Sequence, residues 1–254
     1  MVRLISERES RTAERIAFVL QVGDFEPHRN DADLESMAAP AKYRVVGDFP
    51  DFYSGAFTFP WPVYFIGGNH EPYGFLDTAT PGAPVAENCV YLGRVGAVEI
   101  SGLKVIGLSG IFNQDKFSDQ HPSVSELKTR KKKDYTYFNR DDLDRIVEFG
   151  GADILMVHEW PADIIAEGDR GLFEQQRRSM RYDSVGNEYA RILIDLLSPR
   201  LVICGHMHKK YRNQIRLKSE ALVDVCCLSN VQQGQDSVAF FRISDDGAIT
   251  EIID

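Results

Sequence analysis

The side chains of this sequence that could bind a metal ion lie in four short polar motifs, each preceded by a run of apolar residues. In chain order the motifs are Gly23-Asp24, Gly68-Asn69-His70-Glu71, His158 and Gly205-His206-Met207-His208. The apolar runs have the length and β-branched composition of buried strands, and ligands gather at the carboxyl ends of such strands in layered α/β folds. Asp, Asn and His side chains together offer mixed oxygen and nitrogen donors for a divalent cation. The sequence therefore predicts a metal site built from four separate segments.

The residues of these motifs are suited to different tasks. Asn69 offers a neutral carbonyl oxygen to a cation. His70 could donate a proton to a leaving oxygen, because its unperturbed pKa is about 6.5, and Glu71 could orient His70 by accepting a hydrogen bond. His206 and His208 are two residues apart, so on an extended strand they would face the same side. The predicted metal ligands are Asp24, Asn69, His158, His206 and His208, and the predicted catalytic residues are His70 and Glu71.

Such a site suits phosphoester chemistry. A divalent cation would polarise a phosphoryl oxygen and lower the pKa of a bound water, and two cations about 3.5–4 Å apart would clamp the attacking and leaving oxygens. Histidine-rich ligation favours manganese, iron or zinc over magnesium. Each motif alone has a structural explanation, such as a helix cap at Asp24 or an exposed histidine pair, and only their combination points to a metal site.

Length and composition are those of one globular enzyme domain spanning residues 1–254. The chain is 43% hydrophobic and 26% charged, and its net charge of −9 argues against a general nucleic-acid coating protein. It has no apolar run of membrane-spanning length, no signal-peptide core in residues 1–15, and four cysteines without framework spacing. These features predict a cytoplasmic protein without a membrane partner.

The spacing of apolar residues predicts an alternation of strands and helices, followed by further strands. Strands are predicted at 16–22, 62–66, 90–92, 97–100, 104–108, 154–157, 201–204, 221–228, 237–243 and 248–253, and helices at 29–37, 141–149 and 188–197. Residues 113–137 form a long polar insert with a basic run at 128–133, which is either a substrate-recognition loop or a solvated surface loop. The expected fold is an α/β sandwich of two mixed sheets flanked by helices.

The motifs together resemble the signature of calcineurin-like metallophosphoesterases, and more closely that of RNA lariat debranching enzymes. The residues that carry the closer resemblance are Gly23-Asp24-Phe25, Arg29-Asn30, Ala32-Asp33-Leu34, Lys42-Tyr43-Arg44, Phe52-Tyr53-Ser54-Gly55, 65–71, Tyr91-Leu92-Gly93, 109–112 and His158-Glu159-Trp160-Pro161. The resemblance implies that Asp24 bridges two cations and that Asn69, His158 and His206 complete one metal pocket. It also implies that His208 belongs to the second pocket, that His70 assists the leaving group, and that the insert recognises branched RNA.

The sequence departs from the family pattern at its start. The opening Asp-x-His (or Cys-x-His) motif of the family is absent ahead of Asp24. Either the start is truncated or misassigned, or residues 1–6 are a degenerate first strand with Glu7 and Glu9 at the motif. The final motif has Gly205 where debranching enzymes often have alanine, and the chain ends soon after the core. We therefore expect one well-held cation and a second site that is weak or absent.

Three hypotheses follow from the sequence. The first is a metal-dependent phosphodiesterase or phosphatase with debranching-like architecture, which acts on a phosphoester such as RNA or a nucleotide through water attack assisted by His70. The alternative is a catalytically impaired binding or scaffold protein with the same fold, because the first motif is absent. The third, which the acidic composition disfavours, is a nucleic-acid-binding protein with a structural metal site.

Overall fold

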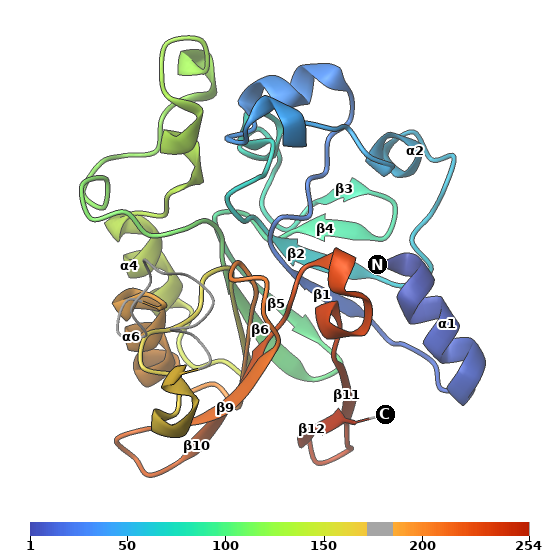
Figure 1. Cartoon of the computed structure of the whole chain (residues 1–254), viewed down its shortest axis with the longest axis vertical. Helices are drawn as coiled ribbons and strands as arrows, with labels where there is room; N and C mark the ends of the chain where they lie inside the picture. The colour runs from blue at the N-terminus through green and yellow to red at the C-terminus, as the bar shows by residue number, and fades with distance from the viewer. Residues whose placement is uncertain (172–184, 254) are drawn as a thin grey trace.

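The computed structural model describes residues 1–171 and 185–253 and shows two mixed β-sheets with helices outside them (Figure 1). The first sheet has the order β1-β2-β4-β3, with β1, β2 and β4 parallel and β3 antiparallel. Its strands are β1 (Val19–Val22), β2 (Val63–Ile66), β3 (Pro84–Ala86) and β4 (Cys89–Tyr91). This sheet positions the first two polar motifs, because β1 ends at Gly23-Asp24 and β2 ends before Gly68-Asn69.

The second sheet has the order β5-β6-β7-β8-β10-β9 and positions the other two motifs. Its strands are β5 (Val95–Ile100), β6 (Leu103–Leu108), β7 (Ile154–Val157), β8 (Leu201–Cys204), β9 (Tyr211–Arg216) and β10 (Leu222–Cys227). The four central strands are parallel, whereas β5 and β9 run antiparallel at the edges. The predicted sandwich of two mixed sheets is confirmed, as are the strand ends before His158 and His206.

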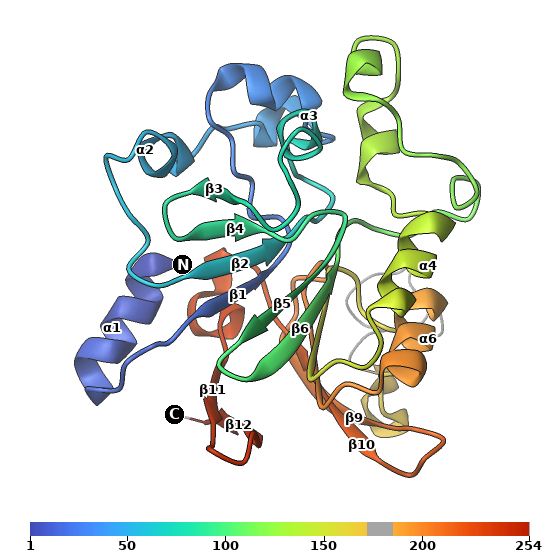
Figure 2. The ribbon, with the colours of Figure 1, turned by 180° about the vertical axis from the view of Figure 1, so that it is seen from behind.

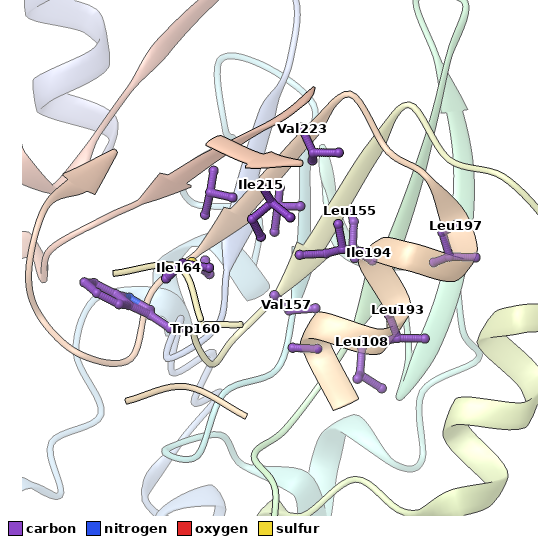
Figure 3. Close-up of a cluster of buried hydrophobic side chains, with 14 of the residues drawn as sticks. Leu108, Leu155, Val157, Trp160, Ile164, Leu193, Ile194, Leu197, Ile215 and Val223 are labelled. Atoms are coloured by element: carbon purple, nitrogen blue, oxygen red, sulfur yellow. The ribbon is translucent and has the colours of Figure 1, made fainter. Parts of the chain in front are cut away.

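A hydrophobic cluster on the outer face of the second sheet anchors β7 (Figure 3). Helix α6 (Glu188–Leu197) lies over this face, with α4 (Arg140–Glu148) beside it. Leu155 and Val157 of β7 pack with Leu193 and Ile194 of α6, and all four side chains are buried. Trp160 is fully buried and stacks on Tyr211, so the segment that follows β7 has little freedom to move.

A second apolar layer fills the space between the two sheets. Val22 and Ile66 from the first sheet meet Met156 and Ile203 from the second. Each of these residues belongs to a strand that leads into one of the four motifs. The same packing that joins the sheets therefore brings the four strand ends together.

The amino terminus forms a helix, α1 (Val2–Thr12), which ends at Ala13 in the left-handed conformation. The helix packs beside the first sheet, where Glu9 accepts hydrogen bonds from the Trp61 indole N–H and the Ile16 backbone N–H. The interpretation of residues 1–6 as a degenerate first strand is wrong, because the buried Ile5 and the capped helix end belong to an amphipathic helix.

The remaining elements are short. They are η1 (Asp31–Ser36), η2 (Ala41–Tyr43), α2 (Phe49–Tyr53), α3 (Tyr73–Leu76), η3 (Val124–Glu126), η4 (Lys132–Thr136), η5 (Glu167–Asp169) and η7 (Val231–Ser237). The helix predicted at 29–37 is the 3₁₀ helix η1, capped by the Asn30 side chain. The insert at 113–137 extends away from the two sheets (Figures 1 and 2).

The carboxyl-terminal strands β11 (Phe240–Ile243) and β12 (Ile249–Ile252) form a separate antiparallel pair. The hairpin lies beside the inter-sheet layer, and Phe241, Ile243 and Ile249 pack against it. In the described parts of the chain, none of the helices is long and apolar enough to cross a lipid bilayer.

Candidate metal centre

The four predicted motifs converge at the carboxyl ends of β1, β2, β7 and β8, and the ring of His158 lies at the centre of the set. Its Nε2 atom is 3.2 Å from Oδ1 of Asn69, 3.2 Å from Nδ1 of His206 and 3.5 Å from Oδ2 of Asp24. Donor atoms that share one cation at about 2.0–2.2 Å lie roughly 3–3.5 Å from each other. The three distances from His158 Nε2 are therefore of the size expected between ligands of one divalent cation.

His158 is fixed in this position from both sides. Its Nδ1 atom lies 2.8 Å from the carbonyl oxygen of Val22, and the residue is only 2% exposed. A histidine that ligates a metal through one nitrogen commonly donates from the other to a carbonyl or carboxylate, which selects the tautomer. The Val22 contact therefore leaves Nε2 of His158 free to face Asn69 and Asp24.

Two glycines permit the close approach of the strand ends. A side chain at Gly23 would overlap the His158 ring, and one at Gly68 would overlap the Asp24 carboxylate. Gly23 also has a φ of 96°, which favours glycine. The glycines that precede the predicted ligands are thus explained by packing at the site itself.

Asp24 and His158 form an ion pair. Burial alone would lower the pKa of His158, but the neighbouring Asp24 carboxylate raises it to about 9. Burial alone would raise the pKa of Asp24, but the positive charge of His158 lowers it well below its usual range. For His206, burial and the charge of His158 lower the pKa to about 4, so this ring is neutral at pH 7 and can offer a lone pair.

Glu71 is fully buried and supports the motif backbone instead of His70. Its carboxylate accepts hydrogen bonds from the backbone N–H groups of Phe25 and Glu26, each at 2.9 Å, and of Gly68 at 3.1 Å. Burial and the Asp24 charge raise its pKa to about 7, against the lowering effect of these donors. The prediction that Glu71 orients His70 by a hydrogen bond is wrong, because the three backbone groups take both of its oxygens.

His70 and His208 lie at the edge of the candidate site. The backbone N–H of His70 donates to Oδ1 of Asp24 at 2.9 Å, which places its partly exposed ring beside the carboxylate. His206 and His208 follow the end of β8 in a turn, with φ values of 63° and 54°. The prediction that the two histidines face the same side of an extended strand is therefore wrong, and His208 is the more exposed of the two.

Sequence reasoning missed several buried groups that support the motifs. The Tyr73 hydroxyl donates to the Gly68 carbonyl at 2.7 Å, and the Ser109 hydroxyl accepts from the Gly67 N–H at 2.8 Å. Glu26, half-buried beside Asp24 and Glu71, has a pKa raised to about 8 by burial and by these two charges. The sequence signals for these residues are the nearness of Tyr73 and Glu26 to a motif and the place of Ser109 in the 109–112 segment that carries the family resemblance.

Glu159 joins three segments next to His158. Its carboxylate accepts hydrogen bonds from the Phe112 N–H at 2.6 Å and from the Asn187 side-chain amide at 2.9 Å. Asn187 is also the N-cap of helix α6, where its oxygen accepts from the Ala190 N–H. This link holds the loop after β7 to α6 and to the start of the insert.

The donor set depends on its asparagine. Within residues 1–171 and 185–253, no three Asp, Glu, His or Cys side chains are close enough to hold a cation by themselves. Asp24, His158 and His206 therefore do not form a three-ligand cation site by themselves, and the Asn69 oxygen is a fourth donor beside His158.

Comparison with known proteins agrees with this arrangement. The pattern of the family described as calcineurin-like phosphoesterase matches residues 2–210. Lariat debranching enzymes of Entamoeba histolytica, Arabidopsis thaliana and Danio rerio are 33%, 32% and 31% identical to the chain, over 83%, 78% and 82% of its length. The chain spans only 60%, 48% and 37% of those relatives.

One solved structure superposes on 99% of this chain and 92% of its own, with a TM-score of 0.51 at 12% identity, which supports the fold alone. The family match covers most of the chain and includes all four motifs, the last of which ends at His208. On this evidence the chain belongs to the calcineurin-like phosphoesterase family.

Proposed function

We propose that the chain is a metal-dependent phosphoester hydrolase that acts on phosphodiesters. The observation that carries this proposal is the position of His158 Nε2, within 3.5 Å of donor atoms from three other segments. A divalent cation of the kind this family uses would supply Lewis-acid polarisation of the phosphoryl group and activation of water. Asn69, His158, His206 and Asp24 would hold it, and mixed nitrogen and oxygen ligation favours manganese, iron or zinc.

Other residues of the chain would supply the proton for the leaving oxygen and hold the site in place. The partly exposed ring of His70, held beside Asp24 through its own backbone, is placed to give a proton to the leaving oxygen. Glu71 positions Asp24 and His70 by fixing the turns that carry them. The site opens on a cavity that His70, His206 and His208 line, which gives a substrate access.

Replacing His70 with alanine is expected to reduce manganese-dependent hydrolysis of an activated phosphodiester by about 10²–10⁴-fold, the usual contribution of a general acid. Manganese affinity should change little, because the four donor groups remain. His121→Ala is the matched control, because His121 lies in the insert beside Asp142 and should keep full turnover. Equal turnover of the wild type and the His70 variant would contradict the proposed role.

A second candidate function is a binding or scaffold module with this fold. It is favoured because no three Asp, Glu, His or Cys side chains among the described residues are placed to hold a cation by themselves. Manganese binding without turnover in the wild type would establish this alternative, whereas metal-dependent turnover would exclude it.

The substrate class that we propose is an RNA or nucleotide phosphodiester, on the basis of the debranching relatives and the basic insert. Lys128, Lys131 and Lys133 are exposed, while Arg130 pairs with Glu126 within the insert. The insert, which contains these lysines, extends away from the two sheets (Figure 1). Lysines on such an arm can neutralise the phosphates of a strand whose scissile bond lies at the metal centre.

Replacing Lys128, Lys131 and Lys133 with glutamine should weaken binding of single-stranded RNA and lower its salt dependence by about two units in the log–log slope. Hydrolysis of a small activated phosphodiester should stay unchanged, since the metal centre is untouched. The charge-matched control replaces the exposed Arg3, Arg145 and Lys218 with glutamine. Equal loss of RNA binding in both triple variants would show that overall charge, and not the insert, is responsible.

A further inference from the structure

The metal centre takes its donor groups from both sheets, so their spacing depends on how the sheets are joined. Asn69 follows β2 of the first sheet, whereas His158 follows β7 of the second. The Oδ1 atom of Asn69 and the Nε2 atom of His158 lie 3.2 Å apart. Ligating groups have to be held within about 0.5 Å of their working geometry. Bonds that cross between the sheets next to Asn69 therefore control this distance.

Polar bonds join the two sheets directly before Asn69, between the ends of β2 and β6. The Gly110 N–H donates to the Gly67 carbonyl at 2.8 Å, and the Gly67 N–H donates to the Ser109 hydroxyl at 2.8 Å. Ser109 is fully buried. Both polar backbone groups of Gly67 are thus bonded to the segment that follows β6 in the second sheet.

The Ser109 hydroxyl also binds the connection by which the chain passes from the first sheet to the second. It donates to the Gly93 carbonyl at 2.6 Å, and the Ser109 N–H donates to the Arg94 carbonyl at 2.8 Å. Gly93 and Arg94 lie between β4 and β5, which belong to different sheets. One buried side chain therefore links the turn before Asn69 to the connection between the sheets.

Tyr73 and Arg94 fix the next residue of the turn, Gly68. The Tyr73 hydroxyl donates to the Gly68 carbonyl at 2.7 Å, and a side chain at Gly67 would overlap this hydroxyl. The Cζ atom of Arg94 lies 3.6 Å from the centre of the Tyr73 ring, and the guanidinium donates to both oxygens of Asp77, at 2.8 and 2.7 Å. The side chains of this ion pair are only 10% and 16% exposed. The ring that holds Gly68 is therefore held in turn by a nearly buried ion pair.

We propose that three side chains, those of Ser109, Tyr73 and Arg94, are positioning residues for the metal centre. They hold the turn before Asn69 at its distance from His158, and they act through the backbone of the two glycines in that turn. This inference rests on the proposed function, because it takes Asn69 and His158 to bind the same cation. Groups that orient metal ligands from behind commonly contribute about 10–100-fold to metal affinity.

The first test removes single hydroxyl groups. Tyr73→Phe and Ser109→Ala should each weaken manganese binding by about 10–100-fold in a calorimetric titration, because the turn before Asn69 is released. The matched controls are Tyr135→Phe and Ser36→Ala, which take from buried residues a hydroxyl that donates to a backbone carbonyl elsewhere in the chain. The controls should lose about 2–4 °C in melting temperature, as expected for a buried hydrogen bond, yet bind manganese like the wild type.

A spectroscopic readout separates positioning from a general loss of stability. At saturating manganese, water should take the place of the displaced Asn69 oxygen in Tyr73→Phe, since water is a suitable manganese ligand. The bound ion should then relax water protons more strongly than in the wild type. Tyr135→Phe should give the relaxation of the wild type, because its turn before Asn69 is intact.

The role of Arg94 is tested by Arg94→Lys, which keeps a positive charge but loses the flat guanidinium that lies on the Tyr73 ring. This change should weaken manganese binding by about threefold or more in the wild type and have no further effect in Tyr73→Phe, because both changes act through one hydroxyl. Arg29→Lys is the matched control and should bind manganese normally. Arg29 also makes a two-bond ion pair and lies 3.8 Å from the centre of an aromatic ring.

The possible failures are distinguishable. Wild-type manganese affinity in Tyr73→Phe and Ser109→Ala would overturn the inference, even if both variants are less stable. An equal loss of affinity in the hydroxyl controls would also overturn it, since lost stability alone would then lower binding. A wild-type protein that binds no manganese would overturn the proposed function, and the inference with it.

Discussion

Replacing His158 with alanine is expected to abolish tight manganese binding and to reduce metal-dependent hydrolysis by roughly 10²–10³-fold or more. Its Nε2 atom lies within 3.5 Å of the other three donor groups of the site, those of Asn69, His206 and Asp24. Polarisation by a bound cation contributes several kcal/mol to phosphoester chemistry, and each 1.36 kcal/mol is a factor of ten in rate. Loss of this ligand therefore affects binding and turnover together.

The measurement is a calorimetric titration with manganese, paired with a turnover assay on the same preparations. The wild type should bind one manganese ion tightly, and His158→Ala none at the same concentrations. His121→Ala, which removes a histidine of the insert, should bind one ion like the wild type. Two tightly bound ions in the wild type would overturn the prediction of one complete pocket, and an unchanged titration of His158→Ala would remove the residue from the ligand set.

Replacing Glu71 with alanine is expected to lower the free energy of unfolding by about 3–5 kcal/mol. The carboxylate is fully buried and accepts hydrogen bonds from Phe25, Glu26 and Gly68, so its removal leaves three backbone N–H groups without this acceptor. Each buried donor left unpaired costs about 1–3 kcal/mol. Glu71→Gln, which keeps the shape and one acceptor oxygen, should lose less.

Urea unfolding in the presence of a chelator separates this effect from metal binding, because a bound ion would itself stabilise the folded state. The midpoint should fall while the slope with denaturant stays the same, since the surface exposed on unfolding does not change. Glu7→Ala on the exposed side of α1 is the control and should stay within about 0.5 kcal/mol of the wild type. A loss for Glu71→Ala as small as that of the control would show that water replaces the carboxylate.

The strand ends that carry the site could be predicted from the sequence, because parallel strands that are buried on both faces appear in it as continuous apolar runs. The apolar runs before His158 and His206 correspond to β7 and β8 at the residues predicted. The polar edge strand β9 could not be predicted in the same way, because only one of its six residues, Ile215, is buried. Its position depends on pairing with β10, a tertiary contact.

The detailed roles within the site depend on contacts that are distant in the sequence. Glu71 follows His70 directly, yet its partners Phe25 and Glu26 lie 46 and 45 residues away. Sequence proximity therefore suggested the wrong partner. The left-handed turn at His206 and His208 was equally hidden, because neither residue is a glycine and the strand before them ends at Cys204.

The hydrogen bonds of Glu159 restrict how the segment that carries His158 can unfold. One carboxylate ties the loop after β7 to Phe112 and to Asn187, and Asn187 caps the helix whose apolar face covers β7. Release of His158 from its position would require these bonds to break and Trp160 to leave its buried pocket. Local fluctuations of low energy therefore cannot expose this histidine by themselves, and its release belongs to the same cooperative unit as the unfolding of α6 and the second sheet.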